Sequence, residues 1–119
     1  MNYDTFGIEI QADFWEVNPE LLNDIKLLRE ISKCAISEAG ATYVNMIEKK
    51  FEPFGVTILI LLQESHFALH SYPEKGFIAL SCYTCGKQCD PEKAIDFMYS
   101  ALSPARIVKQ KTIRGVIPR

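Results

Sequence analysis

Seven consecutive residues, Val56 to Leu62, are apolar apart from one threonine, and they constrain the fold more than any other stretch of the chain. Such a run is typical of a β-strand whose two faces are both buried. It is far shorter than the ~20 apolar residues that a membrane-spanning helix needs. The run therefore predicts a central strand of a sheet, in a protein with no membrane segment.

Five further segments are expected to be strands of the same sheet, because they alternate apolar and polar residues or are rich in β-branched and aromatic residues. The turn from Pro73 to Gly76 joins two of them into a predicted hairpin. The predicted ranges are Gly7 to Trp15, Tyr43 to Glu52, His66 to Tyr72, Phe77 to Tyr83 and Ala105 to Ile113.

Two helix starts have the same pattern of a capping residue, a proline and a glutamate, at Asn18-Pro19-Glu20 and Asp90-Pro91-Glu92. An apolar stripe follows the first start and stops at Gly40, with a break expected near Asn23-Asp24. The second helix is expected to end before Pro104. Two main helices are therefore predicted.

Two helices for about six strands predict an α+β fold, with a single largely antiparallel sheet and both helices packed on one face. No linker or repeat divides residues 1–119, so one domain is expected. Because two helices cannot cover both faces of such a sheet, the apolar run needs a partner on the other face. A homodimer is the simplest arrangement that provides one.

Composition limits the class of partner. The 119 residues include 13 Lys and Arg against 15 Asp and Glu, which gives a net charge of -2. A nucleic-acid-binding protein usually has an excess of basic residues, so nucleic acid is not an expected partner. The first residues, Met1-Asn2-Tyr3-Asp4, do not resemble a signal peptide. A cytoplasmic protein with a small-molecule partner is expected.

Three of the four cysteines lie within eight residues, at Cys82, Cys85 and Cys89, and free thiols are expected. Cys82-x-x-Cys85 has the spacing of a redox dithiol or of half a zinc site. A fourth metal ligand is missing nearby, and no helix starts at the motif as in thioredoxin-like sites. A third interpretation is that these cysteines only pack against their neighbours. The residues alone do not decide among a dithiol, a zinc site and packing.

A longer pattern runs from Glu64-Ser65-His66 through His70-Ser71-Tyr72-Pro73-Glu74 to Thr84-Cys85-Gly86. In these residues and their spacing the chain resembles the short prokaryotic form of S-adenosylmethionine decarboxylase, a pyruvoyl enzyme of polyamine synthesis. The stretch from Phe51 to Val56 and the overall length fit the same family. The resemblance covers most of the chain.

The resemblance implies that the chain cuts itself between Glu64 and Ser65, into fragments 1–64 and 65–119. Ser65 would attack the carbonyl of Glu64, and elimination would leave a pyruvoyl cofactor in place of the serine. His70 would withdraw the proton for that elimination. Cys85 would return a proton to the decarboxylated carbon of the substrate.

The resemblance also implies that Phe51 stacks on adenine, that Glu74 binds the ribose hydroxyls, and that Thr57 assists processing in place of the usual serine. No metal is implied. Cys82 and Cys89 then become packing residues. Besides Thr57, the chain departs from the family pattern at Ile8, Glu9, Asp13 and Ile58.

Those departures leave a second substrate class open, because decarboxylation at a pyruvoyl group needs only an α-amino acid. An arginine or ornithine decarboxylase on the same scaffold is one alternative. Another is an unprocessed, non-catalytic homologue, and a thiol or metal protein is the third.

Overall fold

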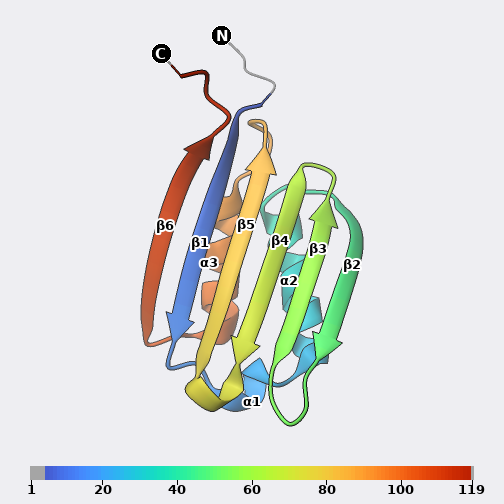
Figure 1. Ribbon diagram of the computed structural model, residues 1–119, viewed down its shortest axis with the longest axis vertical. Helices are drawn as coiled ribbons and strands as arrows, with labels where there is room; N and C mark the ends of the chain where they lie inside the picture. Colours follow the sequence, from blue (N-terminus) through green and yellow to red (C-terminus); the bar gives the residue numbers. More distant parts are fainter. Residues whose placement is uncertain (1–4, 119) are drawn as a thin grey trace.

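The computed structural model describes residues 5–118, which form one six-stranded antiparallel sheet with the strand order β2-β3-β4-β5-β1-β6 (Figure 1). This is the predicted α+β class with a single antiparallel sheet. The strands are β1 (Gly7–Trp15), β2 (Tyr43–Lys50), β3 (Val56–Leu62), β4 (Ser65–Tyr72), β5 (Phe77–Cys85) and β6 (Arg106–Arg114).

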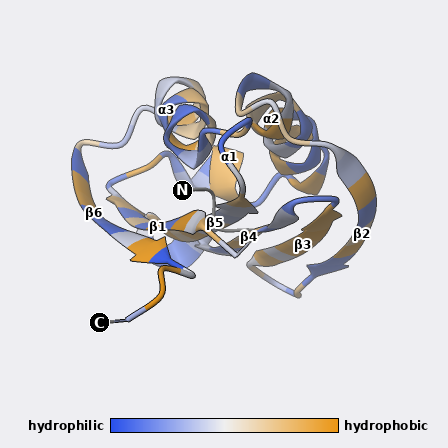
Figure 2. Ribbon diagram, turned by 90° about the horizontal axis from the view of Figure 1, so that it is seen from above, coloured by the Kyte–Doolittle hydropathy of each residue, from blue (hydrophilic) through white to orange (hydrophobic). Residues whose placement is uncertain are grey.

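The helices begin where the sequence predicts. Asn18 caps α1 (Pro19–Leu22) by accepting from the Glu20 N–H, and Asp90 caps α3 (Pro91–Leu102) by accepting from the Glu92 N–H. Asp24 caps a separate helix, α2 (Ile25–Glu38), so the predicted break near residues 23 and 24 is confirmed. All three helices lie on one side of the sheet (Figure 2).

The core lies between these helices and the sheet. Its members are apolar side chains from alternate positions of the strands and from the inner stripes of α2 and α3. The largest fully buried ones are Phe14, Phe67, Ile10, Leu22, Leu28, Ile58, Ile60, Leu69, Ile78, Ile95, Met98 and Leu102.

The position of β3 corrects one prediction. The strand pairs with β2 and β4 and is second from one edge of the sheet, so it is not central. Only alternate residues are buried, and Leu59 and Leu61 are 45% and 56% exposed. Because every helix of residues 5–118 lies on the other side, nothing in that part of the chain covers these two leucines. The prediction of burial on both faces is wrong for the single chain.

We call this uncovered side the open face; it carries Leu59, Leu61, His66 and His70, which lie on alternate positions of β3 and β4. Strand β2 ends two residues earlier than predicted, because residues 51–55 fold into a turn. The Phe51 N–H donates to the Gly55 carbonyl (2.8 Å) and closes it. No helix among residues 5–118 combines the length and hydrophobicity needed to cross a bilayer.

Candidate active site

The residues that the sequence singles out gather at the two ends of β4. We call the first group the cleavage end: Glu64, Ser65 and Cys85. Glu64 lies in the tight turn between β3 and β4, and Ser65 is the first residue of β4. The Glu64 carbonyl oxygen accepts a hydrogen bond from the Cys85 N–H at 2.9 Å. A backbone donor therefore polarises the carbonyl whose carbon Ser65 is expected to attack.

The hydroxyl of Ser65 lies 3.4 Å from Nδ1 of His66, an exposed residue of the open face. Ser65 pairs with Thr84 across β4 and β5, which brings Cys85 next to the cleavage point. A side-chain hydrogen bond with Cys85, together with desolvation, raises the pKa of Tyr83 above its ordinary value. The backbone of Cys85 thus lies beside the bond that is expected to break.

Thr42 is a residue of this site that sequence analysis missed. Its N–H and its hydroxyl donate to the two carboxylate oxygens of Glu64, at 3.0 and 3.1 Å. Its carbonyl accepts from the Gln63 N–H at 2.9 Å. These three bonds hold the turn before Ser65. No local pattern marks Thr42 in the sequence, because the contact joins residues that are 22 positions apart.

We call the second group the binding end: Phe51, Thr57, His70 and Glu74. They line a cavity of about 300 Å³, together with Phe54, Gly55, Ser71 and Tyr72. The Thr57 hydroxyl lies 3.1 Å from Nδ1 of His70, its partner across β3 and β4. Phe51 is 46% exposed, so its ring is available to a ligand. The structure thus brings four of the predicted site residues together.

The two ends lie far apart within one chain. Ser65 and His70 are five residues apart on the same extended strand, a separation of about 16 Å along β4. Figure 1 shows the turn before Ser65 and the turns at residues 51–55 and 73–76 at opposite ends of the sheet. His70 therefore cannot reach the α-proton of Ser65 in its own chain.

The remaining cysteines do not join Cys85. Cys82 is buried, and desolvation raises the pKa of its thiol to about 12. Because it lies three residues before Cys85 on β5, the two thiols point to opposite faces of the sheet. Cys89 is buried where its Sγ donates to the Gly40 carbonyl, and burial raises its pKa too. Within residues 5–118, no three metal-ligating side chains form a cluster.

Three departures from the family pattern, at Ile8, Glu9 and Ile58, make their contacts outside the cavity. Ile58 is fully buried on the helix side of β3, and Ile8 packs against the same core. Glu9 accepts a hydrogen bond from Arg114 at 2.6 Å. None of the three lines the cavity at the binding end.

Known proteins of one family are similar to this chain over most of its length. Residues 8–115 match the family model described as S-adenosylmethionine decarboxylase. The chain is 45% identical to the S-adenosylmethionine decarboxylase proenzyme of Brevibacillus brevis, over 98% of this chain and 87% of the relative. It is 35% identical to the proenzyme of the same name from Thermotoga petrophila, over 93% and 85% of the two chains.

Solved structures give the same result. The adenosylmethionine decarboxylase of Aquifex aeolicus superposes with a TM-score of 0.89 at 32% identity, over 97% of this chain and 95% of that chain. The decarboxylase monomer of Trypanosoma brucei superposes with a TM-score of 0.59 at 13% identity, over 87% of this chain and 44% of that one. The second likeness concerns the fold alone.

Proposed function

The chain belongs to the S-adenosylmethionine decarboxylase family, and we propose that it cleaves itself at Ser65 and then decarboxylates S-adenosylmethionine. The product would be the aminopropyl donor of spermidine synthesis. One observation carries the proposal: the Glu64 carbonyl, held by the Cys85 N–H, precedes a serine at the start of a strand. The two relatives described above are both named proenzymes, and this name supports the proposal that the chain matures by cleavage.

Cleavage begins with attack of the Ser65 hydroxyl on the Glu64 carbonyl carbon. The C–N bond breaks, a C–O ester forms, and the Cys85 N–H stabilises the charge that develops on the carbonyl oxygen. Removal of the Ser65 α-proton then breaks the Cβ–O bond and expels the Glu64 carboxylate, which ends fragment 1–64 and leaves a dehydroalanine with a free amine at position 65. The dehydroalanine tautomerises to an imine, and water hydrolyses this imine to the pyruvoyl ketone of fragment 65–119 and ammonia.

His70 is our candidate for the base that removes this proton. The Thr57 hydroxyl lies beside Nδ1 of His70, and by accepting from an Nδ1–H it selects the tautomer whose Nε2 is free to take a proton. Thr57 keeps the hydroxyl that this contact requires. Its role is therefore to orient the imidazole.

The residues present suit a pyruvoyl group at position 65, because Ser65 is half-buried at a strand end and a backbone donor, the Cys85 N–H, binds the preceding carbonyl. Such a group supplies an electrophilic carbonyl and an electron sink for decarboxylation. Cys85 is the proton donor in our proposal, because its backbone N–H binds the Glu64 carbonyl and so places a thiol-bearing residue beside the cleavage point. At the binding end, the Glu74 carboxylate accepts from both ribose hydroxyls and Phe51 stacks on adenine.

Because about 16 Å separate Ser65 from His70 in one chain, we propose that the working unit is a homodimer. The cleavage end of one protomer would face the binding end of its partner. The exposed Leu59 and Leu61 on the open face supply the apolar surface that such packing buries. Each dimer would then hold two equivalent sites.

Two measurements test the proposal. Denaturing mass spectrometry of the purified protein should detect two fragments, 1–64 and 65–119, and Ser65→Ala should leave one intact chain. CO2 release from carboxyl-labelled S-adenosylmethionine, arginine and ornithine should be found with the first substrate alone. An intact wild-type chain would refute self-processing, and turnover of a basic amino acid alone would refute the substrate assignment.

A further inference from the structure

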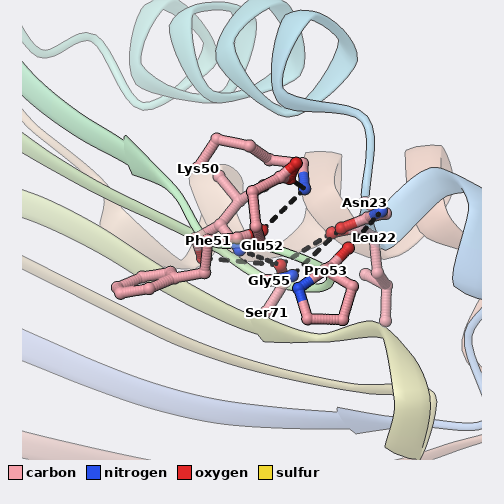
Figure 3. Close-up of polar contacts among 9 residues, drawn as sticks. Leu22, Asn23, Lys50, Phe51, Glu52, Pro53, Gly55 and Ser71 are labelled. Atoms are coloured by element: carbon pink, nitrogen blue, oxygen red, sulfur yellow. Dashed lines mark hydrogen bonds and ion pairs between the residues drawn. The ribbon is translucent and has the colours of Figure 1, made fainter.

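The turn at residues 51–55 carries Phe51 and is held from outside the sheet by the end of α1. Asn23, the C-cap residue of α1, directs its side-chain amide into this turn (Figure 3). Its Oδ1 accepts from the Gly55 N–H at 3.0 Å, and its Nδ2 donates to the Pro53 carbonyl at 3.5 Å. One side chain therefore contacts the turn at two backbone groups.

A second link lies beside the first and is also drawn in Figure 3. The buried Ser71 hydroxyl accepts from the Val56 N–H at 2.9 Å and donates to the Leu22 carbonyl at 2.7 Å. Leu22 is the last residue of α1 and is fully buried, so this end of the helix is fixed in the core. The hydrogen bonds of Ser71 thus connect the residue after the turn to a helix end that is fixed in the core.

The same helix also contacts the other wall of the cavity. α1 packs against the short 3-10 helix η1 (Pro73–Lys75), which contains Glu74. Phe51 and Glu74 lie on two separate loops that bound one cavity. The end of α1 is the element that both loops share, and it can therefore set the distance between them.

We propose that Asn23 is a positioning residue for the nucleoside part of the substrate. By fixing the turn that carries Phe51, it places the Phe51 ring where the ring can stack on adenine. The inference rests on the proposed function and adds a determinant of affinity outside the cavity. Asn23 contacts no reacting atom. Thr57 and His70 are held by the pairing of β3 and β4, so the chemical steps should not depend on Asn23.

The test compares Asn23→Ala with wild type in the processed enzyme. Loss of two neutral hydrogen bonds to the turn should raise KM for S-adenosylmethionine about tenfold and leave kcat and self-cleavage nearly unchanged. Asn23→Asp keeps an acceptor for the Gly55 N–H and should recover part of the affinity. It also provides a second test should Asn23→Ala fail to fold.

Asn18→Ala is the matched control. It removes an asparagine cap from the other end of the same helix, a bond to the Glu20 N–H, and it leaves the turn untouched. We expect its KM to equal that of wild type. Hydrogen exchange at the Gly55 amide provides a readout besides activity: exchange should accelerate in Asn23→Ala and stay unchanged in Asn18→Ala.

The outcomes separate the two proposals. Wild-type enzyme without turnover of S-adenosylmethionine would overturn the proposed function. An active wild type with an unchanged KM in Asn23→Ala would overturn the role of Asn23 alone. The same role would be overturned by an equal rise of KM in Asn18→Ala, or by a fall in kcat at constant KM.

Discussion

If each site combines two protomers, two inactive variants should restore cleavage when they share a dimer. Ser65→Ala keeps His70 but lacks the nucleophile, and His70→Ala keeps the nucleophile but lacks the base. Neither variant should cleave alone. The mixed dimer should contain one site with both residues intact, because the about 16 Å between Ser65 and His70 prevents their cooperation within a chain.

The magnitude follows from pairing statistics. With equal expression and random pairing, about half of the dimers are mixed, and each holds one competent site of two. About half of the His70→Ala chains should therefore be cleaved, which is about a quarter of all chains. Coexpression followed by intact-mass spectrometry measures both fractions directly, because Ser65→Ala chains remain whole in every arrangement.

In the control, Ser65→Ala is coexpressed with a chain that carries both Ser65→Ala and His70→Ala. No cleavage should occur, because neither chain has the nucleophile. Two results would refute the reasoning. Cleavage of His70→Ala alone at the wild-type rate would remove His70 from processing. Absence of cleavage in verified mixed dimers would mean that the two residues do not meet across the interface.

Three further variants test the rest of the site. Cys85→Ala should lose most decarboxylation, as measured by CO2 release. Cys82→Ala removes a thiol that is buried on the other face of the sheet, and it should process and turn over near normally. An equal loss in both variants would contradict the role of Cys85 as proton donor. Glu74→Gln should raise KM for S-adenosylmethionine at least about tenfold while self-cleavage persists, because it removes a charge-assisted acceptor; an unchanged KM would exclude ribose binding. Leu59→Glu should dissociate the dimer and abolish cleavage, as judged by sedimentation and mass, whereas Ile107→Glu, similarly exposed on edge strand β6, should leave both intact; a dimeric Leu59→Glu would refute this interface.

The sequence predicted the starts of the helices well, because a helix cap is a contact between residues that are neighbours in the chain. The two capping residues before proline fix the starts of α1 and α3, and the hydrogen bonds from Asn18 and Asp90 are those that the pattern requires. The break predicted near residues 23 and 24 coincides in the structure with a third cap, at Asp24, which accepts from the Leu27 N–H. These features involve neighbours in the chain, so no tertiary information was needed.

Long-range contacts were beyond the sequence. Nothing local indicates that Thr42 binds the Glu64 carboxylate or that Asn23 holds the turn before β3, because each contact depends on the arrangement of distant elements. The resemblance supplied the site residues, and the five-residue spacing of Ser65 and His70 on an extended strand already gives their separation of about 16 Å. The sequence does not show how a second protomer would bring the two residues together.

The apolar run that first constrained the fold bears on this separation. Leu59 pairs with Ala68, and Ala68 lies between Ser65 and His70 on β4. A two-fold axis in the plane of the interface, perpendicular to the strands and passing over this pair, exchanges the two ends of β4. It would place Ser65 of one protomer near His70 of its partner and bury Leu59 against the other sheet. The run is apolar on both faces, we infer, because one face belongs to the core of the chain and the other to the core of the dimer.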